Sequence, residues 1–362
     1  MSHSERFEIL VLGSGVGGRL LAWHMARAGR RTAVVERRWI GGSCPNVNCL
    51  PSKNEIWSAK VASLVRRSAD YGVNTGHVAI DMAKVRDRKR KMVDDQIAAN
   101  LRNYKDSGTE LIMGSGQFVG PKTLEVQLND RGTQVLVGDR VFINVGTRAA
   151  IPAVPGLEDA HPLTNIEALE LDYLPAHLIV LGGGYVGLEF AQAYRRFGSS
   201  VTVIEHGTQL MGGEDADVSE ELQRLLGNEG IQFLVDAKIL RVHGRSGQEV
   251  SLVVHTRTGE QALEGSDILV AAGRIPNTAD SASTRPASSW TLTPSFASTS
   301  GWRPVRPMSG PSVNARGAPS SRTYRRTTSA SSGTTWPEAR AARAVGWFHT
   351  ACSRTLSSPG SD

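Results

Sequence analysis

The chain has 362 residues, of which 41 are Lys or Arg, 35 are Asp or Glu and only three are Cys. This length allows two or three domains, each with its own hydrophobic core. So few cysteines exclude a disulfide-stapled secreted scaffold and, with no apolar signal core at the N-terminus, favour a cytoplasmic location. No apolar run approaches the ~20 residues of a membrane-spanning helix, so we expect no membrane partner.

The segment from residue 9 to residue 36 has the order strand, glycine-rich turn, helix, strand and acidic residue. Apolar residues 9–12 run into Gly-Ser-Gly-Val-Gly-Gly at 13–18, and a helix is predicted over 19–28. Glycines let the backbone approach a pyrophosphate at a helix N-terminus, and the acid can accept hydrogen bonds from ribose hydroxyls. A lone glycine motif is weak evidence, but this complete order predicts a dinucleotide site. Its expected contacts are Gly13, Gly15, Gly17, Gly18 and Glu36.

The same unit recurs in the middle of the chain. A predicted strand at 177–181 leads into Gly-Gly-Gly-Tyr-Val-Gly at 182–187, a helix follows to residue 197, and a strand at 201–204 ends on Glu205. This internal repeat predicts a second dinucleotide site, formed by Gly182, Gly184, Gly187 and Glu205. A carboxylate there would repel a 2′-phosphate and bind a free ribose diol, so the pattern favours NADH over NADPH.

Two of the three cysteines, Cys44 and Cys49, lie close together just after the first unit, and Lys53 follows them. Zinc needs about four ligands, and no second Cys/His pair has metal spacing, so we expect no metal centre. A structural disulfide and two inert core cysteines remain alternatives to a redox-active pair. A reactive thiolate needs nearby positive charge or a helix start, and Pro51 and Ser52 suit the start of a helix predicted over 54–71.

The cysteine segment resembles the active-site segment of the flavin-dependent pyridine nucleotide-disulfide oxidoreductases, which include dihydrolipoamide dehydrogenase, glutathione reductase and mercuric reductase. Their pattern Gly-Gly-x-Cys-x-Asn-x-Gly-Cys-x-Pro-x-Lys is met from residue 41 to residue 53, except that Asn48 stands where glycine is usual. The resemblance implies FAD in the first dinucleotide site and a nicotinamide cofactor in the second. It also implies that Cys49 lies against the flavin and that Cys44 exchanges with substrate.

Further site residues follow from the same resemblance. Lys53 would lie near the flavin and pair with Glu189, where a cation stabilises a reduced, anionic flavin. Tyr185 resembles a tyrosine that gates the nicotinamide pocket, although simple packing is an alternative. The remaining cofactor contacts implied are Gly42, Ser43, Gly116, Gly146, Thr147 and Gly273.

The reaction implied by the resemblance carries electrons from NADH through FAD to a Cys44–Cys49 disulfide and then to a small-molecule or metal-ion substrate. Lipoamide, a low-molecular-weight disulfide and Hg(II) all suit such a dithiol, and the Cys-Pro-Asn-x-x-Cys variant leans toward a mercuric-reductase-like branch. A catalytically impaired nucleotide-binding fragment, or the product of a pseudogene, is the alternative. The basic cluster at 84–91, within a helix predicted over 81–106, is interpreted as a solvated face and not as a nucleic-acid site.

The resemblance is continuous through Asn277 and stops at about Thr278. The last 85 residues hold 18 Ser, 12 Thr and 10 Arg but no Lys or Ile, and the rest of the chain has 31 basic against 32 acidic residues. The excess positive charge therefore belongs to this tail. A one-base shift of its codons permits Ala-Ile-Gly-Glu-Cys-Ala-Gly within 308–324, which is similar to the family's second flavin motif. Shifted readings of 327–338 and 348–355 are family-like as well.

We therefore expect an α/β protein with two Rossmann-like dinucleotide-binding domains. Residues 1–155 form the FAD-binding domain with the redox-active cysteine pair, and residues 156–277 form the NAD(P)-binding domain. Residues 278–362 are an out-of-frame, disordered tail that does not fold as the dimerisation domain of the homodimeric family. The family's acid/base His-Glu dyad lies in that domain and is missing here, so we expect the chain as written to be a poor enzyme.

We hypothesise that a frameshift between about Thr278 and Ser295 produced this tail, so resequencing the gene across about codons 275–300 should find a one-base insertion or deletion. Restoring the frame should give a longer protein that ends in a dimerisation domain. Stop codons soon after the corrected position would contradict the hypothesis.

Overall fold

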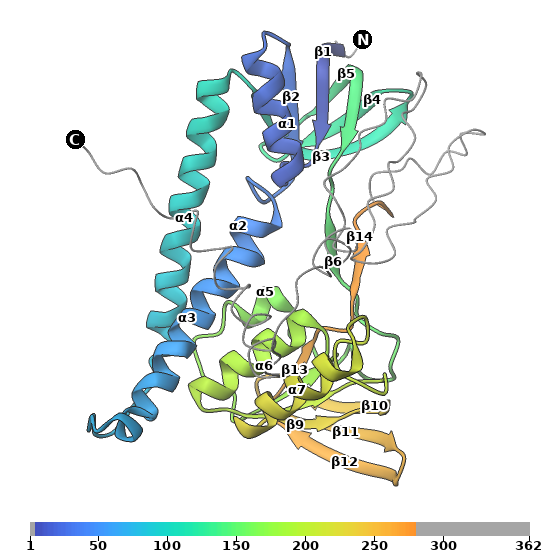
Figure 1. Ribbon diagram of the computed structural model, residues 1–362. Coiled ribbons are helices and arrows are strands. Elements are labelled where there is room, and N and C mark those ends of the chain that lie inside the picture. The colour runs from blue at the N-terminus through green and yellow to red at the C-terminus, as the bar shows by residue number, and fades with distance from the viewer. Residues whose placement is uncertain (1–3, 280–362) are drawn as a thin grey trace, which may run out of the picture.

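The computed structural model describes residues 4–279, and Figure 1 shows them as two α/β halves, one above the other. This arrangement confirms the predicted fold class. The expectation of a disordered tail in place of a dimerisation domain falls on residues 280–362, outside the described part of the chain. The domain boundary at residue 155 stays a prediction, and the two main sheets lie on either side of it.

The first half is built on a closed, five-stranded barrel. Strands β5, β1, β2 and β3 pair in parallel in that order, and β4 closes the barrel by pairing antiparallel with both β3 and β5. The elements of this half are β1 (Ser4–Leu12), α1 (Val16–Arg27), β2 (Thr32–Glu36), α2 (Ser43–Val47), α3 (Cys49–Arg66), the 3-10 helix η1 (Ser68–Tyr71), α4 (Met82–Ser107), β3 (Glu110–Gly120), β4 (Thr123–Leu128), β5 (Thr133–Ile143) and β6 (Thr147–Ala149).

The barrel wall has two buried faces because successive residues of a strand point to opposite sides. Leu10 of β1 lies in the barrel interior with Leu124. Its neighbour Val11 lies in the outer cluster with Trp23 of α1 and Tyr104 of α4, whose rings meet edge to face. This outer packing fixes α1 against the wall, so that its N-terminus lies at the carboxyl end of β1.

The second half contains a four-stranded parallel sheet in the order β13-β7-β8-β9 and a three-stranded antiparallel sheet, β10-β11-β12. A short ribbon of β14 and β6 connects this half back to the first. The elements are α5 (Asn165–Ala168), β7 (His177–Leu181), α6 (Tyr185–Phe197), β8 (Ser200–Ile204), α7 (Ala216–Asn228), β9 (Gln232–Leu234), β10 (Lys238–Arg245), β11 (Glu249–Thr256), β12 (Gly259–Gly265), β13 (Asp267–Val270) and β14 (Arg274–Pro276).

The parallel sheet of the second half also buries both faces. Ile179 lies in one cluster with Leu252 of β11, and Val180 lies in the other cluster with Phe190 of α6. The second cluster includes Ala59 of α3, so the helix that begins with Cys49 packs directly on the second half. Within residues 4–279, no helix combines the length and the apolar character needed to cross a membrane.

The strands and helices predicted for both glycine-motif units are present, with ends shifted by a few residues. Residues 141–148 contain the end of β5 and the start of the separate strand β6. No short-range pattern in the sequence predicts the hairpin of β3 and β4 or the sheet of β10 to β12. These antiparallel strands carry no glycine motif and are stabilised by long-range burial, which short-range patterns do not report.

We predict that Gly187→Ala destabilises the chain by roughly 1–3 kcal/mol, because overpacking has a cost of this size. A Cβ atom at Gly187 in α6 would lie only 2.0 Å from the carbonyl oxygen of Gly182. Gly227, on the exposed side of α7, is the matched control because a Cβ there meets nothing within 4 Å. Gly227→Ala should stabilise by roughly 0.5–1 kcal/mol. Urea unfolding measures both changes, and equal effects would contradict this account.

Candidate active site

The first glycine-rich turn lies between β1 and α1 and leaves little room for a side chain at three of its four predicted glycines. A Cβ atom on Gly13, whose φ is +100°, would lie 2.3 Å from the carbonyl oxygen of Asn144. The corresponding distances are 2.7 Å from Gly15 to the Asn144 amide nitrogen and 2.5 Å from Gly18 to the Gly13 carbonyl oxygen. Gly17 has an ordinary contact distance of 3.5 Å. Close approach of strand, turn and helix therefore accounts for three of the four predicted glycines.

Glu36 ends β2 and holds this turn in place. Its carboxylate accepts hydrogen bonds from the Ser14 backbone N–H (2.9 Å) and hydroxyl (2.7 Å) through Oε2. Its Oε1 accepts from the backbone N–H groups of Arg38 (2.8 Å) and Trp39 (2.9 Å). The predicted ribose-binding acid is therefore a buried organiser of the turn, and its contact with a ribose stays a prediction.

The surroundings of the turn fit an anionic dinucleotide. Arg19 of α1 donates from its guanidinium to the Asn100 Oδ1 atom at 2.7 Å, while Arg19 Nε and Asn100 Nδ2 are buried with no hydrogen-bond partner. Burial lowers the pKa of the Arg19 guanidinium. A helix N-terminus, a nearby cation and unused buried donors are what a pyrophosphate needs. FAD fits these residues.

The second turn repeats this geometry. A Cβ atom on Gly182, whose φ is +112°, would lie 2.5 Å from the Ala271 carbonyl oxygen. Glu205 accepts from the N–H groups of Gly183 (2.7 Å) and Gly207 (2.7 Å), and the Glu205–Gly183 separation of 22 residues equals that of Glu36 and Ser14. Gly184 has open space where a Cβ would lie. The turn therefore fits a second dinucleotide.

Tyr185 is the first residue of α6 and is partly exposed next to this turn. Its hydroxyl donates to Glu214 Oε1 at 2.5 Å, and this hydrogen bond raises the pKa of the Tyr185 hydroxyl to about 12. His206, whose side chain is 93% exposed, has its Nδ1 atom 2.8 Å from Glu205 Oε1. A gating role for Tyr185 stays a prediction.

The cysteine segment touches the first glycine turn. Gly42 has a φ of +80°, and a Cβ atom there would lie 2.4 Å from the Cα atom of Gly15. Ser43 and Cys44 follow immediately as the first residues of α2, and Cys49 is the first residue of α3. Neither cysteine is part of a disulfide bond in this structure. The fold thus brings the predicted dithiol to the predicted flavin site.

Cys49 has the properties of a reactive thiol. Its pKa is lowered to about 6, first because Cys44 hydrogen-bonds to it and further because the Lys53 ammonium is near, while burial and Glu189 oppose the shift. Its side chain is nevertheless exposed. Above pH 6 the reduced chain therefore presents Cys49 as an accessible thiolate.

Lys53 and Glu189 pair as predicted. Lys53 Nζ lies 2.6 Å from each carboxylate oxygen of Glu189, and both side chains are about 30% exposed. The pair joins α3 to α6 and therefore crosses between the two halves. It places a cation on the same helix as the Cys49 thiolate.

The other predicted contacts lie in different settings. Gly146 and Gly273 have positive φ angles and open space at the Cβ position, whereas Gly116 lies in β3 with Leu12 Cδ1 only 2.8 Å from such an atom. Packing alone therefore explains a glycine at 116, and its cofactor contact stays a prediction. Thr147 in β6 accepts hydrogen bonds from Arg274 at both Oγ1 and its carbonyl oxygen, each at 2.8 Å.

Sequence reasoning missed Arg274 as a site residue. Burial lowers the pKa of its guanidinium, and the charge of Cys49 acts in the opposite direction, so a second cation lies within electrostatic range of the thiolate. The available indication in the sequence was the pair Gly273-Arg274, which follows the strand that ends at residue 270. Among the described residues, no group of three His, Cys, Asp or Glu side chains could hold a metal ion.

Comparison with known proteins finds similarity over this same part of the chain. A family model described as pyridine nucleotide-disulphide oxidoreductase matches residues 7–287. Dihydrolipoyl dehydrogenase of Bacillus subtilis (strain 168) is 33% identical over 286 residues, which are 76% of this chain and 60% of the relative. Mercuric reductase of Staphylococcus aureus is 29% identical over 278 residues, which are 75% of this chain and 49% of the relative.

Solved structures are similar to this chain over the same share of its length. The Cu(II) complex of the HOCl-induced flavoprotein disulfide reductase RclA from Escherichia coli matches with a TM-score of 0.66 and 28% identity, covering 76% of this chain and 58% of that one. The chain thus spans from about half to 60% of the length of these relatives.

We predict that iodoacetamide alkylates Cys49 of the reduced chain at a constant rate above about pH 7 and about tenfold more slowly for each unit below pH 6, because only the thiolate reacts. Cys44→Ala and Lys53→Met should each raise the midpoint, since each removes a contribution that lowers the pKa of Cys49. Lys84→Met is the control, because the Lys84 side chain is 86% exposed, and it should leave the midpoint of Cys49 alkylation unchanged. Mass spectrometry of the Cys49 peptide measures the rates, and a midpoint near 8.5 in the unaltered chain would contradict the assignment.

Proposed function

Because the chain belongs to the pyridine nucleotide-disulphide oxidoreductase family, we propose that it is a flavin-dependent oxidoreductase that uses NADH to reduce a Cys44–Cys49 disulfide. The resulting dithiol passes its electrons to a disulfide or a metal-ion substrate. The observation that supports this most directly is the contact of Gly42 with Gly15, because it joins the cysteine segment to the first dinucleotide turn.

The side chains of the site prepare the cysteine pair for electron transfer. Reduction of the disulfide takes two electrons and one proton, and leaves a thiol on Cys44 and a thiolate on Cys49. The Cys44 hydrogen bond and the Lys53 charge stabilise this thiolate. Glu189 holds Lys53 in place from the other half of the molecule. When bound, FAD and the nicotinamide supply the two-electron transfer that no side chain can provide.

The second turn supports NADH as the reductant. Glu205 places a carboxylate directly after β8, and the exposed His206 is the only ionisable side chain among its described contacts. A negative charge at this position disfavours a 2′-phosphate and favours a free diol.

The substrate class is open between disulfides and metal ions. Relatives that match this chain are named dihydrolipoyl dehydrogenase and mercuric reductase, and one structural neighbour is a Cu(II) complex. The Cys-Pro-Asn-x-x-Cys variant makes Hg(II) our first candidate. The catalytically impaired nucleotide-binding fragment is the alternative.

An anaerobic thiol titration tests this proposal. The purified 362-residue chain, supplied with FAD, should show a flavin spectrum, and stoichiometric NADH should expose two new thiols on the oxidised protein. Cys49→Ser should abolish both this thiol exposure and any long-wavelength thiolate-to-flavin absorption. Turnover of NADH with lipoamide, a small disulfide or Hg(II) then ranks the substrates. Binding of both cofactors without new thiols would establish the fragment alternative.

Calorimetry on the same preparation tests the two acidic residues as a matched pair. Glu205→Gln should weaken NADH binding by roughly tenfold and leave FAD retention unchanged, because it removes a charge-assisted hydrogen bond worth about 1.5–3 kcal/mol at most. Glu36→Gln should weaken FAD retention and leave NADH binding unchanged. Equal NADH and NADPH affinities in the unaltered chain would show that Glu205 does not set the preference.

A further inference from the structure

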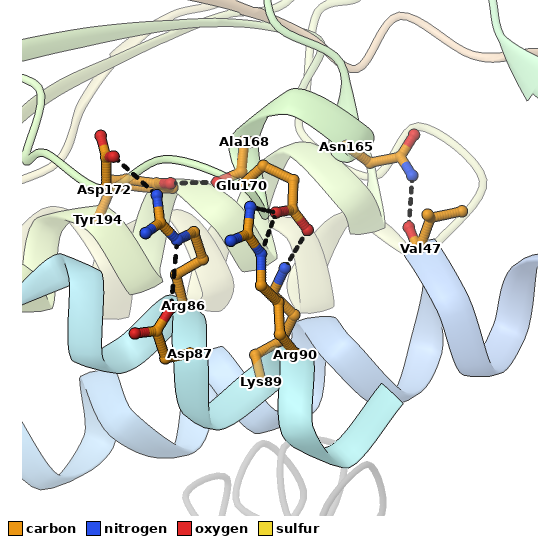
Figure 2. A network of polar contacts seen from close by, with 10 residues as sticks. All are labelled: Val47, Arg86, Asp87, Lys89, Arg90, Asn165, Ala168, Glu170, Asp172 and Tyr194. Carbon is orange, nitrogen blue, oxygen red and sulfur yellow. Dashed lines mark hydrogen bonds and ion pairs between the residues drawn. The ribbon is translucent and has the colours of Figure 1, made fainter. Parts of the chain in front are cut away.

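Asn165, in the second half of the chain, contacts the turn between the two cysteines. It is the first residue of α5 and is 5% exposed. Its amide nitrogen donates to the carbonyl oxygen of Val47 at 2.7 Å and to the side-chain oxygen of Asn48 at 3.2 Å. Figure 2 shows the Asn165 amide directed at Val47, the last residue of α2. Both acceptors lie between Cys44 and Cys49.

The position of Asn165 is fixed within its own element. Thr164 caps α5 with a capping box: its hydroxyl accepts a hydrogen bond from the Ile166 backbone N–H at 3.2 Å, and the Glu167 carboxylate accepts one from the Thr164 backbone N–H at 2.9 Å. The Tyr194 hydroxyl, fully buried in α6, donates to the Ala168 carbonyl oxygen at 2.6 Å. The amide of Asn165 is therefore a stationary donor.

Ion pairs tie the next residues to α4 of the first half (Figure 2). Glu170 binds both Lys89, which is 1% exposed, and Arg90, whose Nε lies 2.7 Å away. Asp172 binds the Arg86 guanidinium at 2.7 Å. The segment 165–172 is thus held by α6 through Tyr194 and by α4 through the two ion pairs.

The Val47 carbonyl lies at the end of α2 and accepts its hydrogen bond from Asn165. The last carbonyl groups of a helix have no intrahelical partner, and a polar group away from water has to find one. The bond from Asn165 fixes the end of α2 relative to the start of α3. Because Cys44 lies in α2 and Cys49 begins α3, this fixes how the two sulfur atoms face one another.

We propose that Asn165 is a positioning residue for the redox pair, which it serves by holding the Val47–Asn48 turn from the opposite half of the molecule. The inference rests on the proposed redox function of Cys44 and Cys49. Asn48 takes part because it stands where the family pattern has glycine, and a glycine would offer no side-chain acceptor. The donor and its second acceptor thus form a pair across the two halves.

The test is the pH profile of Cys49 alkylation in the full reduced chain. Lys53 of α3, Glu189 of α6 and Arg274 of β14 are the charged groups that act on Cys49, and none of them changes in the variants used. Asn165→Ala should raise the pKa of Cys49 by about one unit, a tenfold loss of thiolate below the midpoint, since the Cys44 hydrogen bond is no longer held. Asn48→Ala removes only the 3.2 Å hydrogen bond from Asn165 to the Asn48 side chain and should raise the pKa of Cys49 by less.

Asn129→Ala is the matched control. The Asn129 amide also donates to a backbone carbonyl, that of Arg37, at 3.0 Å, but from the exposed end of β4. It should leave the alkylation profile unchanged. If Asn165→Ala does not fold, Asn48→Ala alone decides the question. If Cys49 has a low pKa in the unaltered chain and neither variant changes it, this inference alone is overturned. If Cys49 has an ordinary pKa in the unaltered chain, the proposed function is overturned.

Discussion

The backbone of Gly42 passes so close to Gly15 that position 42 does not accept a side chain, and Gly15 is close to Asn144 in turn. A Cβ atom on Gly42 would lie 2.4 Å from the Cα atom of Gly15, and one on Gly15 would lie 2.7 Å from the Asn144 amide nitrogen. Three chain segments therefore meet at one point: the first glycine turn, the residue after β5 and the entry to the cysteine helices. The chemistry proposed for the chain depends on this contact, since it puts a dithiol within reach of a dinucleotide.

Helix α3 carries the consequence of that contact into the second half. It begins at Cys49, presents Lys53 to Glu189 and packs its alanines against α6. Glu55, 3% exposed on the same helix, has a pKa raised to about 8 by burial, so it is largely a neutral carboxyl group near pH 7. A neutral acid suits the apolar contact between the helices, whereas a carboxylate there would need a partner. Helix α3 is thus part of the interface between the two halves.

The two dinucleotide turns differ at one residue that bears on their ligands. Ser14 gives Glu36 both a backbone and a hydroxyl donor, while Gly183 gives Glu205 only a backbone donor. Glu36 is correspondingly buried, with 8% of its surface exposed. The repeat therefore preserves a backbone geometry that fits a pyrophosphate, and varies the side chains around the acid.

The sequence by itself determined the elements that short-range patterns encode. Strand, glycine turn, helix and acid follow one another locally, so both repeats, Cys44, Cys49 and the Lys53–Glu189 pair could be predicted from spacing and family resemblance. Only the tertiary structure decided what depends on long-range contact: the antiparallel strands that close the barrel, the place of Arg274 near Cys49, and the hold of Asn165 on the turn at Val47. Asn165 and Val47 are 118 residues apart, and nothing in the local sequence of either indicates the other. Packing of α3 and α4 against the second half brings them together, because burial and ion pairing act on distance in space and not along the chain.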